Sequence, residues 1–189
     1  PHDLMQRLMD AKDPETGTGM SDEQLIDNLL TFFSAGHETT AKALTWTLYL
    51  LARSPEWADR LVDEVRRVAG EAPITAAHID KLPLIAQVLK ESMRLYPPAP
   101  VISRITKAAT ELGGEPVAAG VQTVIPIYAI HRHKSLWEDP DLFDPTRFAP
   151  EREAQLQRYQ YMPFGAGPRI CIGMAFAMIE ATAILATLI

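Results

Sequence analysis

Cysteine is almost absent from the sequence: Cys171 is the one thiol among 189 residues. A single thiol cannot form a disulfide within the chain, and it falls short of the roughly four ligands that a structural zinc ion takes. A reducing compartment is therefore expected, and the cytoplasm is the predicted localisation. The sequence also lacks the roughly 18 to 20 consecutive apolar residues of a bilayer-spanning helix, and no signal-peptide pattern opens it. No membrane anchor is seen in these residues.

Positive charge is also scarce. Lys and Arg number 18 against 24 Asp and Glu, so the net charge is −6. Without a basic stripe the chain has no surface suited to phosphates, and we expect no nucleic-acid partner. Nucleotide motifs are missing too: after Gly165 and Gly167, the third glycine of GxGxxG would replace Ile170, and no GxxxxGK[ST] occurs. The HExxH pattern of zinc proteases fails at Ala41.

Helical periodicity dominates what is present. Ser21 and Gln24 form a capping box, and an apolar helical pattern continues from there to about residue 52. Ser54 is expected to cap the next helix, which should end near Gly70. The remaining pattern predicts helices at about 4–9, 84–95 and from 174 onward, β runs over 101–130 with a turn at Gly113–Gly114, and an ordered loop over 134–161. The fold class is therefore mainly α with a small β portion (α+β).

The segment FGAGPRICIG, from Phe164 to Gly173, surrounds the cysteine. Cys171 is open to three interpretations: a small apolar residue, a nucleophile, which would need a paired base, or a metal-bound thiolate. Its position directly before an apolar helical run favours the thiolate, because a helix N-terminus stabilises a negative sulfur. The glycines would let the backbone pass close to something large and flat, and Arg169 would supply a positive charge. Haem iron accepts a single axial thiolate.

Five positions of this segment match the haem-binding loop FxxGxRxCxG of the cytochrome P450 family: Phe164, Gly167, Arg169, Cys171 and Gly173. The sequence thus resembles that family. The resemblance implies haem b (iron protoporphyrin IX) as cofactor, Cys171 as the axial thiolate ligand of its iron, the other four residues in the cofactor-binding site, and O2 as co-substrate. It also implies the cytochrome P450 fold, incomplete at both ends, with residues 1–189 as the C-terminal part of a single domain.

A second match lies in KESMRLYPP, where Glu91 and Arg94 stand three residues apart on one predicted helix face. Taken alone, such a pair is most simply a surface ion pair of little energetic consequence. The resemblance assigns it to the ExxR motif of the family. It then implies a structural cluster of Glu91 and Arg94 with Arg147, which stands in DPTRF.

A third match lies in AGHETT, within the long predicted helix. Gly36 costs about 1 kcal/mol relative to alanine there, and close helix packing is one explanation for it. The resemblance gives another, because Ala35, Gly36, Glu38 and Thr39 match the family pattern [AG]Gx[DE]T. It implies that Thr39 hydrogen-bonds dioxygen and that Glu38 relays protons toward it, which makes these two the predicted catalytic residues. An alcohol beside a carboxylic group suits proton delivery into a nearly dry pocket.

Two further residues are candidates for contact with the haem propionates. Arg104 is either such a partner or a solvated strand residue. His131 and His133 have the spacing of a two-histidine metal site, but no further ligand is in sight. The resemblance implies a basic residue near this point that meets a propionate, and His131 is the candidate.

The resemblance implies a haem-thiolate monooxygenase that inserts one atom of O2 into an apolar organic substrate. Electrons would come from NAD(P)H through a flavin or iron–sulfur redox partner, separate or fused. Substrate contacts are expected from Phe33, Ser34 and residues 99–102. The alternatives are a non-catalytic haem-binding protein and a peroxide-driven oxygenase, and the Glu38–Thr39 pair argues against both.

Overall fold

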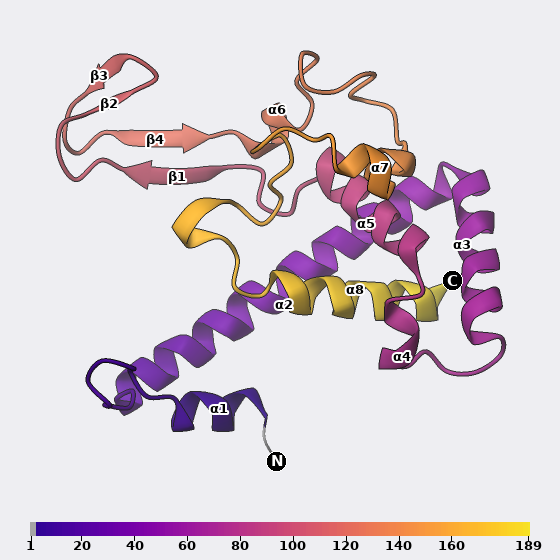
Figure 1. Cartoon of the computed structure of the whole chain (residues 1–189), viewed down its shortest axis with the longest axis horizontal. Coiled ribbons are helices and arrows are strands. Elements are labelled where there is room, and N and C mark those ends of the chain that lie inside the picture. The colour runs from indigo at the N-terminus through magenta and orange to yellow at the C-terminus, as the bar shows by residue number, and fades with distance from the viewer. Residues whose placement is uncertain (1–2) are drawn as a thin grey trace. The chain divides into compact units, whose positions relative to one another are not determined.

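The computed structural model describes residues 3–189 and is drawn in Figure 1. The chain divides into two compact units, one of residues up to Thr39 and one of Thr40–Ile189. The elements, in chain order, are α1 (Leu4–Asp10), α2 (Asp22–Ala52), α3 (Pro55–Ala69), α4 (Ala76–Ile79), α5 (Pro83–Leu95), β1 (Ile102–Ile105), β2 (Thr110–Leu112), β3 (Glu115–Val117), β4 (Gln122–Ile125), α6 (Ile127–Ile130), η1 (Pro145–Phe148), α7 (Pro150–Glu153), η2 (Gly167–Arg169) and α8 (Met174–Leu188). Within residues 3–189, no helix combines the length and the apolar content needed to cross a membrane.

The long helix α2 begins at the predicted capping box. Ser21 N donates to Gln24 Oε1 at 2.9 Å, and Gln24 N donates to Ser21 Oγ at 3.2 Å. These two bonds satisfy backbone N–H groups that the first helical turn leaves without partners. The helix is then continuous for 31 residues, to Ala52, as the sequence predicted.

The predicted cap of α3 is not made, and α5 has a cap that the sequence did not predict. Ser54 occupies the N-cap position of α3 but makes no capping hydrogen bond with its side chain. The N-terminus of α5 is instead capped from α3, because the buried carboxylate of Glu64 accepts hydrogen bonds from Leu84 N at 3.0 Å and Ile85 N at 3.1 Å. A carboxylate at this helix end also meets the positive end of the helix dipole. It ties α3 to α5.

The β portion consists of two antiparallel pairs (Figure 1). β1 pairs with β4, with Ile102 opposite Ile125, and β2 pairs with β3 across the predicted turn. Gly113 and Gly114 have φ of 60° and 89°, the left-handed conformations that a tight hairpin turn requires. The expected β run is wrong beyond Pro126, because residues 127–130 form the helical turn α6.

The core of residues 40–189 lies around α5, which packs against α3, α8 and η1. The packed residues are apolar side chains from α2, α3, α5, α8 and the segment before α5: Leu44, Leu51, Trp57, Leu61, Leu82, Ile85, Val88, Leu89, Ala181, Leu185 and Ala186. Burial of this set from water is the main stabilising contribution to the unit. It surrounds α5 with protein and thereby excludes water from the polar residues on its last turns.

Glu91 and Arg94 form an ion pair inside this core, and both side chains have 0% exposed surface. Arg94 Nε donates to Glu91 Oε2 at 2.7 Å, and Arg94 Nη2 donates to Glu91 Oε1 at 2.8 Å. Arg147 joins them, with its Nε 3.4 Å from Glu91 Oε1. Burial raises the pKa of Glu91, while the hydrogen bonds from Arg94 and the charge of Arg147 oppose that rise. The structure thus brings the three predicted structural residues together, and places the pair in the interior rather than on the surface.

The remaining donors of this cluster bind the long loop that follows α6. Arg94 Nη1 donates to the carbonyl oxygens of His131 at 2.9 Å and Pro140 at 2.7 Å, and Nη2 donates to that of Leu142 at 3.0 Å. Asp144 N in turn donates to Glu91 Oε1 at 2.9 Å. The path of the loop from 131 to 144 is therefore fixed by one buried ion pair.

His131 lies beside this cluster, and its side chain has no exposed surface. Its Nε2 accepts a hydrogen bond from Met162 N at 2.9 Å, and its ring stacks on Tyr161 with 5.3 Å between centroids. Burial lowers the pKa of His131 to about 4, and the positive charge of Arg94 acts in the same direction. This placement contradicts the predicted contact of His131 with a haem propionate, because a fully enclosed side chain presents no atom to a ligand.

We expect Glu91→Gln to lower the free energy of unfolding by about 3–5 kcal/mol, because it leaves the buried charge of Arg94 without its counter-ion. The matched control is Glu153→Gln. Glu153 pairs with Lys90 at 2.6 Å, but the two side chains are 37% and 29% exposed, so the expected loss is under about 1 kcal/mol. Urea unfolding of the full-length protein measures both. Equal losses in the two variants would contradict this account.

We expect His131 to make stability fall as pH falls. Its pKa is about 4 when folded and 6.5 when free, so between these values the unfolded chain takes up the proton first. The contribution, about 3 kcal/mol by this shift, is complete above pH 6.5 and is lost toward pH 4. Urea unfolding at several pH values should therefore show a steeper loss for the wild type than for His131→Gln. Glu91 is common to both proteins, so its titration cancels; parallel curves would disprove the contribution.

Candidate functional site

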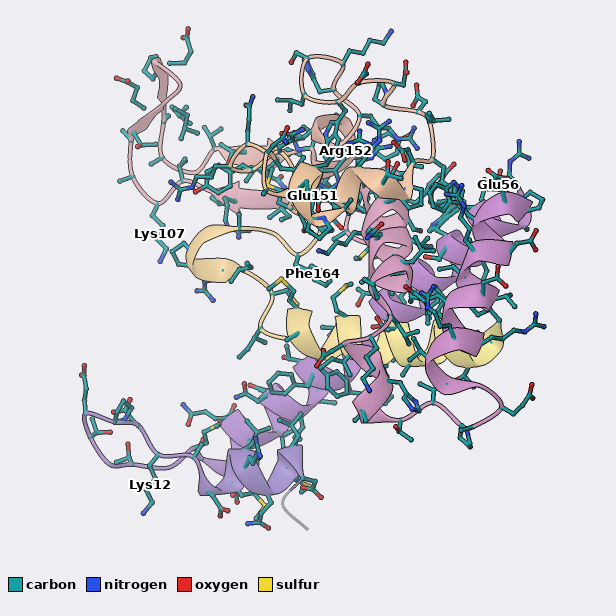
Figure 2. All side chains as sticks on the ribbon, turned by 45° about the vertical axis from the view of Figure 1, so that its right-hand side comes forward. Lys12, Glu56, Lys107, Glu151, Arg152 and Phe164 are labelled. Atoms are coloured by element: carbon teal, nitrogen blue, oxygen red, sulfur yellow. The ribbon has the colours of Figure 1, made fainter. Side chains whose placement is uncertain are left out.

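The loop around Cys171 is held by its own backbone. Cys171 N donates to Phe164 O at 2.9 Å, which closes the segment into a compact turn, and Ile170 N donates to Gly167 O at 3.1 Å. Gly165 N donates to Met162 O at 3.0 Å, just before the turn. Figure 2 labels Phe164 at the point where the chain enters this loop ahead of α8. The thiol of Cys171 is free and exposed, so it is available to a ligand from outside the described residues.

Two glycines determine the shape of the loop. Gly165 and Gly167 have φ of 73° and 71°, a conformation that residues with a Cβ rarely adopt. A Cβ at Gly165 would also lie 3.3 Å from Ile102 Cδ1, so the loop packs directly against β1. Gly173 serves differently: its φ is −84°, and a Cβ there would lie 3.8 Å from Cys171 Sγ. The space beside the sulfur is kept open by a residue that has no side chain.

Cys171 stands at the N-terminal end of α8, with Gly173 as the N-cap residue. Gly173 contributes no capping side chain, so the first turn of α8 keeps backbone N–H groups near the sulfur. The positive end of a helix dipole favours a thiolate at such a position. Two apolar residues close to Cys171 in sequence are exposed, Ile172 at 86% and Phe176 at 71%. Exposed apolar side chains on the segment that carries the thiol are compatible with a large, apolar ligand.

Two arginines are positioned to meet negative groups of such a ligand. Arg169, in the loop itself, is exposed, and within residues 3–189 it makes no ion pair. Arg104 is exposed on β1, and its Nη1 donates to Ser103 O at 2.8 Å. Side chains two residues apart on a strand lie on one face, so Arg104 shares a face with Ile102, the residue next to Gly165. Both arginines therefore belong to the surroundings of the cysteine loop.

Among the described residues no three His, Cys, Asp or Glu side chains gather in a way that could hold a metal ion. Cys171 is the candidate ligand that the cysteine loop offers to a metal. Haem iron accepts such a ligand, since the porphyrin supplies the four equatorial nitrogens, and the residues present fit that group.

Glu38 and Thr39 lie on α2 in the unit up to residue 39, and both are exposed. Thr39 Oγ1 donates to Ala35 O at 2.7 Å, the back-bond to the preceding turn that threonine makes in helices. This bond orients the hydroxyl and leaves its oxygen able to accept a further hydrogen bond. A Cβ at Gly36 would meet nothing within 4 Å outside its own helix among the described residues. One turn earlier, Phe33 is 72% exposed and stacks on His37 at 5.4 Å.

The anchor of the loop entry on α5 was not predicted from the sequence. Tyr161 Oη donates to Lys90 O at 2.9 Å, and the next residue, Met162, donates its N–H to His131 Nε2. Tyr161, just before the Phe164–Gly173 segment, is an aromatic residue of a kind that often packs in the interior. Its partners, however, come from segments far away in sequence. Burial raises the pKa of Tyr161, so its hydroxyl stays protonated and continues to donate.

Comparison with known proteins agrees with this geometry. The family model described as Cytochrome P450 matches residues 1–189. Cyclooctatin synthase of Streptomyces melanosporofaciens is 42% identical over 186 residues, which are 98% of this chain and 40% of that protein. Cytokinin hydroxylase of Arabidopsis thaliana is 41% identical over 189 residues, 99% of this chain and 36% of that protein. A self-sufficient cytochrome P450 monooxygenase of Oidiodendron maius is 42% identical over 189 residues, 99% of this chain and 18% of that protein.

The crystal structure of the cytochrome P450DA heme domain superimposes with a TM-score of 0.90 at 38% identity, over 96% of this chain and 40% of that one. The predicted fold is thereby confirmed. The chain spans between 18% and 40% of the length of the three relatives. The chain therefore belongs to the cytochrome P450 family.

Proposed function

We propose that this chain carries the cysteine ligand of a haem-thiolate monooxygenase, which inserts one atom of O2 into an apolar organic substrate. The observation that carries the proposal is the exposed, unpaired thiol of Cys171 at the start of α8, in a loop whose shape depends on Gly165 and Gly167. Residues 1–189 are the C-terminal part of a single domain in this proposal, which the 40% coverage of the P450DA heme domain supports.

Each residue of the loop has a separate task in holding haem b. Cys171 would provide the thiolate ligand and Gly173 would leave room beside the sulfur, while Phe164 O accepts the hydrogen bond that places the cysteine backbone. Arg169 and Arg104 would bind the propionate carboxylates, because arginine pairs with carboxylates through two parallel N–H groups. When bound, the haem supplies the oxygen-activating chemistry, to which a thiolate ligand contributes electron density.

Glu38 and Thr39 deliver protons. The Thr39 hydroxyl carries one hydrogen, which it donates to Ala35 O, so it donates to another group only when it gives up that bond. Glu38 is exposed and exchanges protons with water, and in this proposal it supplies them through water to the Thr39 oxygen, which accepts one as the hydroxyl passes its own on. A residue pair of this kind has no use in a protein that merely holds haem, and the peroxide-driven alternative needs no such supply either.

The substrate class and electron supply follow from the same proposal. Phe33 and Val101 are exposed apolar residues at the two predicted substrate-contact segments, which favours an apolar substrate. In this proposal electrons come from NAD(P)H through a flavin or iron–sulfur partner, separate or fused. A fused arrangement has a precedent in the relative named self-sufficient.

We expect Cys171→Ser to abolish the strong red shift of the Soret band in the ferrous–carbonyl complex of the full-length protein, because an alcohol does not replace the thiolate on iron. The matched control is Met174→Leu, which removes the exposed sulfur three residues away and should leave the band unchanged. A wild-type protein that binds haem without the red shift would refute the proposed function.

We expect Thr39→Ala to divert reducing equivalents into hydrogen peroxide. Product per NAD(P)H consumed should fall about tenfold, less than the 10²-fold or more that loss of a general acid can cost, since water partly replaces the hydroxyl. The matched control is Thr45→Ala on the same helix, because Thr45 makes the same back-bond, to Ala41 O at 2.8 Å. Peroxide and product are measured together, with a surrogate redox partner. Equal peroxide release by both variants would remove Thr39 from the mechanism.

A further inference from the structure

We propose that His131 is a positioning residue for Cys171: by accepting the hydrogen bond of Met162 N, it fixes the start of the cysteine loop to the buried Glu91–Arg94 pair. This inference rests on the proposed function, since it concerns how the thiolate is presented to haem. It assigns no contact with the ligand to His131 itself.

The bond between Met162 and His131 has one possible direction. A backbone N–H only donates, so Nε2 of His131 must accept, and the ring is neutral with its proton on Nδ1. The distance is 2.9 Å and the His131 side chain has 0% exposed surface, so no water reaches the acceptor atom. Tyr161 stacks on the ring and keeps it from turning.

His131 accepts one hydrogen bond through its backbone and another through its side chain. Its backbone carbonyl accepts from Arg94 Nη1 at 2.9 Å, while its side chain accepts from Met162 N. Beyond Met162, the backbone bonds pass from Gly165 N to Met162 O at 3.0 Å and from Cys171 N to Phe164 O at 2.9 Å. An unbroken series of hydrogen bonds therefore runs from the buried arginine to the backbone of the cysteine.

The bond from Tyr161 Oη to Lys90 O is a second attachment of the same segment, but it reaches through a long side chain. The hydrogen bond from Met162 N to His131 Nε2, by contrast, holds the backbone of this segment directly. Replacement of His131 by an apolar residue would leave the half-buried Met162 N–H without its acceptor, which favours movement of the segment toward another partner. The segment that moves is the one that leads into the cysteine loop.

The experiment compares three variants of the full-length haem protein: His131→Leu, His131→Gln and His133→Leu. Leucine removes the acceptor, glutamine offers Oε1 at a similar reach, and His133 is the exposed histidine two residues away. We expect His131→Leu to release haem about tenfold faster and to convert part of the red-shifted ferrous–carbonyl band to the unshifted form. His131→Gln should keep the rate of haem release and the red-shifted band close to those of the wild type, and His133→Leu should match the wild type in both.

Amide hydrogen exchange gives a readout that is independent of haem and of activity. In the wild type we expect slow exchange at Met162 and Cys171, and in His131→Leu fast exchange at both while the amides of α5 stay protected. A wild-type Met162 amide that exchanges rapidly overturns the proposal even if the variants do not fold. So does a folded His131→Leu protein with unchanged haem release. Failure of the proposed function looks different: the wild type then lacks the red-shifted band, whatever exchange at Met162 shows.

Discussion

The guanidinium of Arg94 is the group on which the rest of this structure depends. It is completely buried, and a buried charge is tolerated only when it is paired and hydrogen-bonded. Its five N–H groups make five hydrogen bonds, two to Glu91 and three to the carbonyls of His131, Pro140 and Leu142. Each carbonyl belongs to a loop without regular secondary structure at that point. Because the buried Arg94 guanidinium needs hydrogen-bond acceptors, it determines the path of the loop that supplies these carbonyls.

That requirement extends to the reactive end of the chain. The loop so fixed continues through η1, whose Phe148 packs on Tyr161 with 4.6 Å between ring centroids, and Tyr161 leads directly into the cysteine segment. The thiol itself lies at the exposed end of this series, because a ligand has to reach it. Rigid support beneath an open ligand position is what a metal site requires if the ligand is to keep its geometry when the metal is absent. The buried Glu91–Arg94 ion pair takes no part in the chemistry, but it belongs to the structure that supports the cysteine loop.

Local chemistry explains what could be predicted from the sequence. The capping box at Ser21 and Gln24, the turn at Gly113–Gly114 and the helix end at Gly70 each depend on neighbouring residues, and all three are present. The errors arose where a partner comes from far along the chain. The cap that Glu64 supplies to α5 was not predicted, and an apolar segment after Pro126, predicted as a strand, forms a helical turn because tertiary packing overrides its strand propensity. The Glu91–Arg94 spacing alone was equally compatible with a solvated surface pair.

The two histidines of IHRH show why the site was only partly predictable. They stand two residues apart with the same chemistry, yet His131 is enclosed and His133 is exposed. The strand geometry that would place both on one face does not apply, since the segment follows α6 in a turn where His131 N donates to Ile127 O. The buried ring then meets Met162, a residue 31 positions away. For Cys171, the neighbouring glycines and the helix start act locally, so a role as cofactor ligand could be proposed from the sequence alone. For a histidine whose role depends on which backbone N–H it meets in the interior, the distinction exists only once the chain has folded.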